Sequence, residues 1–199
     1  DMHIDDGEFV FLVGPSGSGK STIIKLLTAE LKPTSGSVLV NGYQLESIKR
    51  ASIPYMRRTL GVIFQDFRLI ENKTVYENVA FAMRVIGAAP KEIKKRVPYV
   101  LELVGLENKG RRLPNELSGG ELQRFCIARA LGAHPSYLIA DEVSTMLDAV
   151  TQAQIWSVLL AEADRRQMGL IFVSHSPALA SRLATRVVEL PAVPAAVRG

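Results

Sequence analysis

One octapeptide, Gly14-Pro15-Ser16-Gly17-Ser18-Gly19-Lys20-Ser21, has the glycines, the lysine and the hydroxyl residue of a phosphate-binding loop at the required spacing. Glycines let consecutive backbone N–H groups turn toward phosphate oxygens. Lys20 is predicted to reach the β and γ phosphates of a nucleotide, and the Ser21 hydroxyl to bind Mg²⁺. The alternative, a merely tight turn, fits the context poorly, because an apolar run at residues 9–13 precedes the loop and Thr22 opens a helix after it.

The composition is that of one domain with a sizeable core. The chain has 199 residues, of which 47% are hydrophobic, and this length supports one domain with a subdomain. The single cysteine, Cys126, cannot form an internal disulfide, so we expect a cytoplasmic protein. Cys126 lies in an apolar segment and is predicted to be a core residue rather than a nucleophile.

Charge and hydropathy exclude some classes of function. No apolar run approaches the roughly 18 residues that span a bilayer, so a membrane role requires a partner. The net charge of +4 is carried by basic residues scattered among acidic ones, which is typical of solvated faces. We therefore expect no direct contact with nucleic acid.

Four apolar runs of strand length alternate with longer segments of helical period, which indicates an α/β fold with a parallel sheet wrapped by helices. The runs cover residues 9–13, 60–64, 137–140 and 170–173. They are followed by the glycine loop, Gln65, Asp141-Glu142 and Ser174-His175 respectively. Because ligands bind beyond the carboxyl ends of the strands in such sheets, these four ends should meet at one crevice.

The polar residues at these ends suggest the parts of a nucleotide site. Asp141 is predicted to hold Mg²⁺, usually through water, and Glu142 to orient or deprotonate the attacking water. Taken alone, this acidic pair would as readily have a purely structural role, because acidic residues often cap strand ends or begin helices. Gln65 and His175 would each be ordinary surface residues in isolation, and their shared position at strand ends favours a role in the site.

Helical periodicity dominates the middle of the chain, at residues 75–86 and 93–104. We predict a catalytic core at residues 1–65 and 132–190, an inserted helical subdomain at 66–131, and a loose tail at 191–199. Pro90 and Pro98 are expected to interrupt the helical pattern, with Pro98 in a first turn or at a kink.

A second motif is Leu117-Ser118-Gly119-Gly120-Glu121-Leu122-Gln123-Arg124. A Ser-Gly-Gly turn at the start of a helix over residues 121–131 offers N–H groups and the positive end of a helix dipole to an anion. The alternative is a plain helix cap, in which Ser118 caps the helix and Glu121 completes a capping box. Both interpretations can hold together.

Taken together, the motifs resemble the ATP-binding cassette (ABC) ATPases over nearly the whole chain. The matching segments are Walker A at residues 14–22, the Q-loop at Gln65, the signature at 117–121, Walker B at 137–142, the D-loop at 144–148 and the H-loop at His175. The resemblance implies a P-loop NTPase (RecA-like) core that binds ATP and Mg²⁺. The site residues that it implies are Gly14 to Thr22 for the nucleotide, Ser21, Gln65 and Asp141 for the metal, and Glu142, His175, Gln65 and Lys20 for catalysis.

The resemblance also implies a head-to-tail dimer, either of two copies or with another ABC ATPase. In such a dimer Ser118, Gly119, Gly120 and Asp148 of one subunit complete the ATP site of the other. Some positions depart from the family. Few residues precede the first strand, where members carry a further β segment whose aromatic side chain stacks on adenine, so we expect that segment to be largely missing and assign no residue to base stacking. Val143 replaces a common proline, and Ser176 a common aspartate.

The residues within and around the motifs resemble those of two different subfamilies. Residues 1 to about 120 resemble the cell-division ATPase FtsE, and residues from about 121 onward resemble the ATPases of dipeptide and nickel importers. We therefore expect a chimera joined near the signature motif.

The function that the resemblance implies is hydrolysis of ATP by a subunit that drives or regulates a membrane partner. That partner would be an FtsX-like permease or the permease of a peptide or metal importer, docked near residues 65–70, and the protein would lie on the cytoplasmic face of the bacterial inner membrane. Two alternatives remain: a soluble ABC ATPase of DNA repair or translation, although the chain lacks the long coiled-coil insertion or second cassette expected there, and a nucleotide-binding module with little turnover.

Overall fold

The computed structural model describes residues 2–141, 147–173, 180 and 183–192. Five parallel strands form one sheet in the order β4-β5-β6-β1-β7. Their bounds are Phe9–Val13 (β1), Leu60–Ile63 (β4), Tyr137–Asp141 (β5), Gly169–Val173 (β6) and Arg186–Glu189 (β7). Parallel neighbours need crossover connections, which the helices supply. The predicted α/β fold is therefore confirmed.

The four predicted strands correspond to β1, β4, β5 and β6, with bounds that differ by at most one residue. The edge strand β7 was not predicted. Its only apolar residues are Val187 and Val188, and its exposure alternates along the strand. A run of two apolar residues gives no periodic signal, so this strand is recognised only through its pairing with β1.

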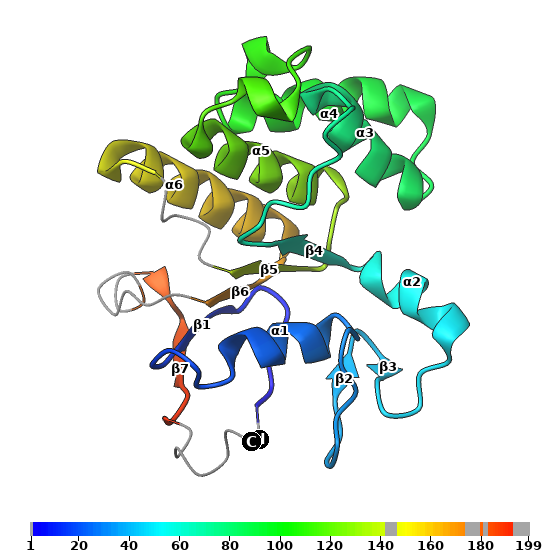
Figure 1. Ribbon diagram of the computed structural model, residues 1–199, viewed down its shortest axis with the longest axis vertical. Coiled ribbons are helices and arrows are strands. Elements are labelled where there is room, and N and C mark those ends of the chain that lie inside the picture. The colour runs from blue at the N-terminus through cyan, green and yellow to red at the C-terminus, as the bar shows by residue number, and fades with distance from the viewer. Residues whose placement is uncertain (1, 142–146, 174–179, 181–182, 193–199) are drawn as a thin grey trace.

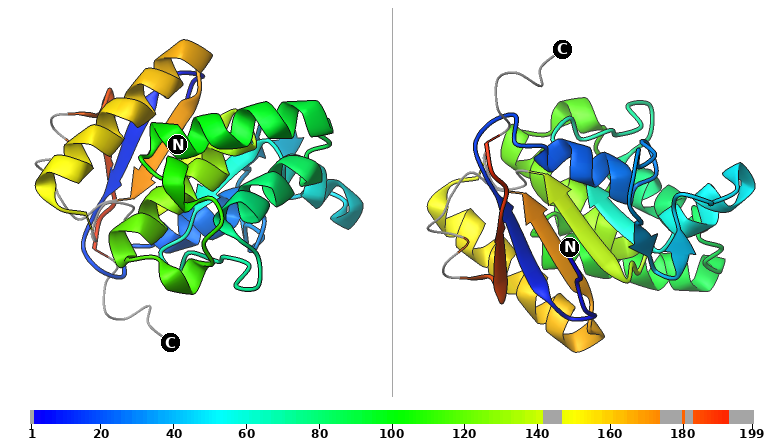
Figure 2. Two further views of the ribbon diagram at one scale, coloured as in Figure 1. Left: turned by 90° about the horizontal axis from the view of Figure 1, so that it is seen from above. Right: turned by 90° about the horizontal axis from the view of Figure 1, so that it is seen from below.

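Helices cover both faces of the sheet, as Figures 1 and 2 show. On one side lie α1 (Lys20–Leu27), α2 (Ile53–Arg57) and a small hairpin of β2 (Leu39–Val40) and β3 (Tyr43–Gln44). On the other side lie α5 (Gly119–Gly132) and α6 (Ala149–Arg166), and α3 (Val75–Val85) and α4 (Pro90–Leu103) pack on α5. Short 3₁₀ turns occupy Arg50–Ser52, Glu107–Lys109 and Pro114–Glu116.

Alternation along β1 divides the core into two layers, because successive side chains of a strand point to opposite faces. Val10 and Leu12 pack with Ile24 of α1. Phe9 and Phe11 face the other way, into a group of rings completed by Trp156 of α6 and Phe172 of β6. The first strand thereby fixes α1 and α6 on opposite faces.

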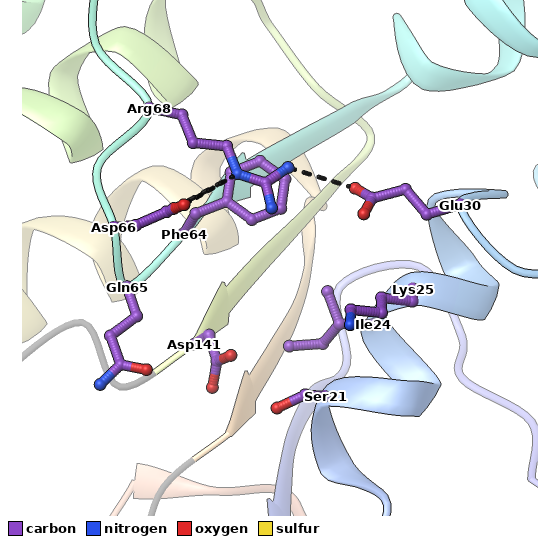
Figure 3. Close-up of a pocket in the computed structure, with 9 residues that line it drawn as sticks. All are labelled: Ser21, Ile24, Lys25, Glu30, Phe64, Gln65, Asp66, Arg68 and Asp141. Carbon is purple, nitrogen blue, oxygen red and sulfur yellow. Dashed lines mark hydrogen bonds and ion pairs between the residues drawn. The ribbon is translucent and has the colours of Figure 1, made fainter.

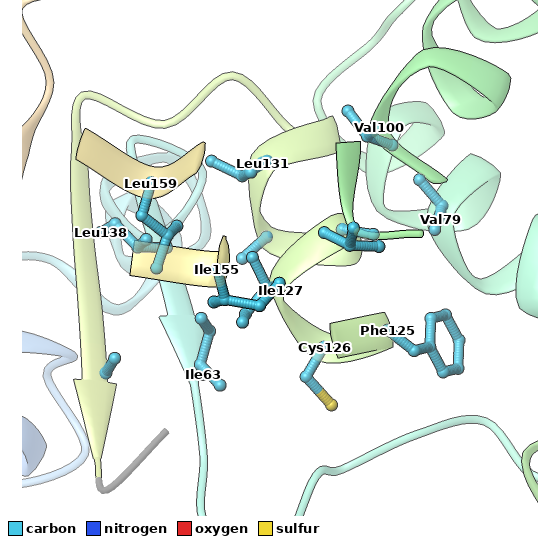
Figure 4. Packing of buried hydrophobic residues seen from close by; sticks show 14 of the residues in the cluster. Ile63, Val79, Val100, Phe125, Cys126, Ile127, Leu131, Leu138, Ile155 and Leu159 are labelled. Carbon is cyan, nitrogen blue, oxygen red and sulfur yellow. The ribbon is translucent and has the colours of Figure 1, made fainter. Parts of the chain in front are cut away.

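Helix α5 is buried on nearly every side. Figure 4 shows its residues between Ile63 and Leu138 of the sheet and Val79 and Val100 of α3 and α4. Gly132 permits the close approach of α3, because a Cβ there would lie 2.8 Å from Cγ1 of Val79. One apolar cluster therefore continues from β1 through α5 to α4.

Proline affects α4 less than the sequence suggests. Pro90 is the first residue of α4, where a missing N–H costs nothing. Pro98 lies inside the same helix and not in a first turn, and α4 continues past it to Leu103.

Polar contacts join α4 to α6. The Tyr99 hydroxyl donates to Glu162 Oε1 at 2.7 Å, and Arg96 lies 3.6 Å from the same carboxylate. Within the described part of the chain, no helix is long and apolar enough to cross a membrane.

Replacing Phe11 by alanine should lower the free energy of unfolding by about 3–5 kcal/mol, because it empties the centre of the ring group. The matched control is Phe81→Ala on α3, whose side chain is 43% exposed and whose removal should cost less than about 1 kcal/mol. Urea denaturation followed by circular dichroism measures both. A loss for Phe11→Ala no larger than that of the control would contradict the assignment of β1 to the core.

Candidate functional site

The predicted phosphate loop connects β1 to α1, and its backbone requires glycine at two positions. Gly19, the N-cap of α1, has φ of 96°, in the left-handed region that favours glycine. A Cβ on Gly14 would lie 2.7 Å from Ser18 Oγ and 2.8 Å from the carbonyl oxygen of Leu190. The loop therefore wraps tightly ahead of the helix N-terminus, which is the arrangement that presents N–H groups to an anion.

Lys20 is held inside this loop. Its side chain is buried, and Nζ donates to the carbonyl oxygens of Gly14 at 2.7 Å and Pro15 at 2.9 Å, with Ser18 Oγ at 3.5 Å. Among the described residues its hydrogen-bond partners are all neutral. The positive charge consequently remains available to a phosphate, as the sequence predicts for this residue.

An open pocket of about 460 Å³ lies beside the loop, between α1, the segment after β4 and the end of β5. In Figure 3, Ser21, Gln65 and Asp141 extend toward the same open space. The pocket is lined by Ser21, Ile24, Lys25, Glu30, Phe64, Gln65, Asp66, Arg68 and Asp141. The structure thus brings together three residues predicted for the metal, from three separate parts of the chain.

The donor set of this pocket suits Mg²⁺ bound together with a phosphate. A hydroxyl, an amide and a carboxylate supply oxygen atoms, and Mg²⁺ commonly takes one or two carboxylates plus substrate phosphates and water. The part of the chain that is described contains no cluster of three or more His, Cys, Asp or Glu that would hold a metal on its own. A metal here would therefore depend on the nucleotide for ligands.

Two predicted catalytic residues, Glu142 and His175, lie outside the described residues, as do Ser144 to Met146 of the predicted D-loop. The strands that lead to them are β5 and β6, which pair in register with Asp141 opposite Val173. The roles of Glu142 and His175 remain predictions.

The signature turn begins α5 and forms the predicted capping box. Ser118 is the N-cap, its Oγ accepts from the Glu121 N–H at 3.3 Å, and the Ser118 N–H donates to Glu121 Oε2 at 2.9 Å. The hydrogen bonds from Ser118 and Lys109 hold the pKa of Glu121 below its usual value. Ser118 and Gly119 are exposed, and none of residues 118–120 lines the pocket. Within one chain, the signature turn and the pocket are therefore separate.

Asp148, the last residue of the predicted D-loop, is the N-cap of α6. Its carboxylate accepts from the N–H groups of Val150 at 3.1 Å and Thr151 at 2.9 Å, and from the Thr151 hydroxyl at 2.6 Å. These bonds, the hydroxyl first, lower the pKa of Asp148. The residue is exposed at the surface, and its predicted role across a dimer interface remains a prediction.

One wall of the pocket was missed by the sequence analysis. The Arg68 guanidinium lies 3.7 Å from the centre of the Phe64 ring and forms ion pairs with Glu30 at 3.4 Å and Asp66 at 3.3 Å. Glu30 lies just beyond α1 and is far from Arg68 in the sequence. No motif or periodicity connects the two residues, so only the fold reveals this link between α1 and the loop after Gln65.

The prediction for Cys126 is confirmed. Its side chain is fully buried in α5 and points toward the carbonyl oxygen of Phe67, 3.7 Å from Sγ. Burial raises the pKa of the thiol to about 11. Since the thiolate is the nucleophile, Cys126 is a packing residue.

Comparison with known proteins agrees with this geometry. Residues 1–145 match the ABC transporter family. The cell division ATP-binding protein FtsE of Bacillus subtilis is 47% identical over 189 residues, covering 94% of this chain and 82% of that protein. The FtsE of Mycobacterium tuberculosis is 48% identical over 95% of this chain and 82% of its own length. Methionine import ATP-binding protein MetN 1 of Bacillus licheniformis is 37% identical over 96% of this chain and 57% of its own length.

Solved structures show the same fold. The dimeric structure of MJ0796, a bacterial ABC transporter cassette, superposes with a TM-score of 0.88 at 33% identity, over 96% of this chain and 84% of that one. The same cassette in a post-hydrolysis state bound to ADP and Pi gives a TM-score of 0.86 at 35% identity, over 95% of this chain and 83% of that one.

The comparisons do not support the expectation of a chimera. The FtsE of Bacillus subtilis matches this chain continuously over 189 residues, across the supposed junction near the signature motif. The methionine import protein covers the same range at lower identity. Proteins of both kinds thus match the chain on each side of the supposed junction.

A phosphate loop, a pocket with oxygen donors and a capped signature turn thus lie on a parallel-sheet core of the same fold as the solved cassettes, and the chain belongs to the ABC transporter ATPase family.

Proposed function

We propose that this chain is the ATP-hydrolysing subunit of a membrane complex and that two copies bind ATP between them, head to tail. One observation carries the proposal: the pocket beside the phosphate loop has no wall from the signature turn of its own chain, while that turn is capped and exposed. A second subunit would supply the missing turn. The solved dimer of a related cassette supports the pairing of two subunits.

Each group of site residues has its own role in this proposal. The N–H groups of residues 14–21 and the Lys20 ammonium bind the phosphates, with Ser21, Gln65 and Asp141 placed for Mg²⁺. When bound, Mg²⁺ would neutralise charge that develops on the phosphates. Glu142 would accept a proton from the attacking water, and His175 would take part in catalysis. Ser118, Gly119, Gly120 and Asp148 would act on the partner's nucleotide.

A permease would contact the surface formed by the loop after Gln65 and by α3. This loop runs from the pocket to α3, where Phe81 and Val85 are each 43% exposed one turn apart. Because the FtsE relatives share more identity with the chain than the importer relatives, we favour a cell-division permease of the FtsX type over an importer. The complex would then lie at the cytoplasmic face of the inner membrane.

Replacing Phe81 and Val85 together by serine should abolish capture of such a permease in detergent, because it removes the exposed apolar pair. ATP hydrolysis by the isolated subunit should stay within twofold, which separates docking from catalysis. Val150→Ser, which changes another exposed apolar residue (68% exposed) on α6, is the control. Unchanged capture by the double variant would place the docking surface elsewhere.

Mixing two inactive variants should restore hydrolysis if the signature turn acts on the partner's ATP. Lys20→Met removes the phosphate-binding charge. Ser118→Asp keeps a good N-cap for α5 and places a negative charge against the phosphate. Each variant alone should be inactive, whereas a mixed dimer contains one site with both native residues. Lys32→Met, at an exposed lysine, is the control for loss of charge. Release of phosphate by each variant and by the mixture measures this, and a mixture as inactive as its parts would contradict the head-to-tail arrangement.

Glu142→Gln should bind ATP and accumulate as a dimer with little release of phosphate, because the amide cannot accept the proton from water. Size-exclusion chromatography with ATP and Mg²⁺, beside a phosphate-release assay, measures both properties. Wild type that binds ATP without turnover would favour the alternative of a nucleotide-binding module. A Glu142→Gln variant that hydrolyses ATP at the wild-type rate would show that another group is the base.

A further inference from the structure

The loop after Gln65 contains two consecutive left-handed residues that are not glycine. Phe67 has φ of 59° and Arg68 has φ of 44°. Residues with a side chain avoid this region, because Cβ crowds the following carbonyl group, and such a conformation persists only when its surroundings hold it. Two of them in succession, next to a residue that lines the pocket, therefore require a specific anchor.

Arg129 of α5 provides that anchor. One guanidinium nitrogen donates to the carbonyl oxygen of Arg68 at 2.5 Å, and the other terminal nitrogen donates to that of Phe67 at 2.9 Å. The planar fork of arginine thus bridges the two carbonyls of the two strained residues. Its partial burial lowers the pKa of Arg129.

Apart from the long contact of the Cys126 thiol with the Phe67 carbonyl, 3.7 Å from Sγ, the other contacts of this loop act on different groups. The Arg68 side chain pairs with Glu30 beyond α1. At the far end of the loop, Asn78 of α3, 1% exposed, accepts from the N–H of Ile70 at 2.9 Å and donates to its carbonyl at 3.0 Å. Neither contact holds the carbonyls of Phe67 and Arg68. Among the described residues, Arg129 is the charged group that fixes the left-handed pair.

We infer that Arg129 is a positioning residue that holds Gln65 in the ATP site by clamping the left-handed pair Phe67-Arg68. The inference rests on the proposed function, since it takes the pocket to be the nucleotide site. Helix α5 would then have two roles, one at each end. Ser118 and Arg129 lie three helical turns apart, about 16 Å, so the helix that offers its N-terminus to the partner's ATP also fixes the loop of its own site.

Arg129→Gln should lower kcat for ATP hydrolysis about tenfold, because a left-handed pair without its clamp populates other conformations. KM for ATP should change less than twofold, since the phosphate loop is untouched. Arg129→Lys, a second variant in case the first folds poorly, keeps the charge without the fork and should give an intermediate kcat. Arg165→Gln removes an exposed arginine of α6 and is the control, with kcat within twofold of wild type.

A rescue experiment isolates the backbone conformation. Added to Arg129→Gln, Arg68→Gly should restore most of the lost kcat relative to Arg129→Gln with Arg68→Ala. Both second substitutions delete the same side chain, and only glycine adopts the left-handed region without strain. Equal activity of the two double variants would overturn the inference, as would a kcat of Arg129→Gln within twofold of wild type.

Hydrogen exchange of the peptide covering residues 64–74, measured without nucleotide, separates this inference from the proposed function. Exchange should be faster in Arg129→Gln than in wild type and unchanged in Arg165→Gln. Unaltered exchange in Arg129→Gln would overturn the positioning role. If the wild-type protein hydrolysed no ATP, the proposed function would fall, and the exchange result alone would decide whether Arg129 holds the loop.

Discussion

Burial of α5 between the sheet and the pair α3–α4 is the constraint on which the rest of the structure depends. A helix packed on both sides cannot shift along its axis without opening voids, because interiors are close-packed. The position of its N-terminus and of each polar side chain along it is therefore fixed relative to β4 and β5. In the proposed dimer, this rigidity would allow Ser118 at one end and Arg129 near the other to serve two different sites.

Electrostatics then distinguishes the cations around the pocket. Arg68 is paired with Glu30 and Asp66 and stacked on Phe64, so its charge is largely compensated and its role is to shape the wall. Lys20 is surrounded by carbonyl oxygens, which solvate an ammonium group without neutralising it. The attraction for an anion is consequently concentrated at the phosphate loop, next to the oxygen atoms of Ser21 and Asp141.

Much of this was predictable because the signals are local. The glycine loop, the strands β1, β4, β5 and β6, and the capping box of Ser118 each depend on residues within one short segment. The missed features depend on distance: Arg129 meets the carbonyls of Phe67 and Arg68 across 61 or 62 positions, and Glu30 meets Arg68 across 38. The expectation of a chimera, which the comparisons do not support, has another origin. The residues that suggested a second subfamily include the buried Phe125, Cys126 and Ile127. At such positions one apolar side chain can replace another of similar volume, so these residues reveal little about ancestry.

The separation of the signature turn from the pocket has a thermodynamic meaning. If one chain held both halves of the site, a single subunit would bind ATP as well as a dimer does, and ATP binding would not favour dimerisation. In the proposed head-to-tail dimer the halves lie on opposite subunits, so ATP would stabilise the dimer by the free energy that it gains from the second half. Hydrolysis would remove that gain. In this proposal the clamp of Arg129 on the loop after Gln65 and the signature turn at Ser118 lie near opposite ends of one rigid helix, so α5 would connect the two ATP sites.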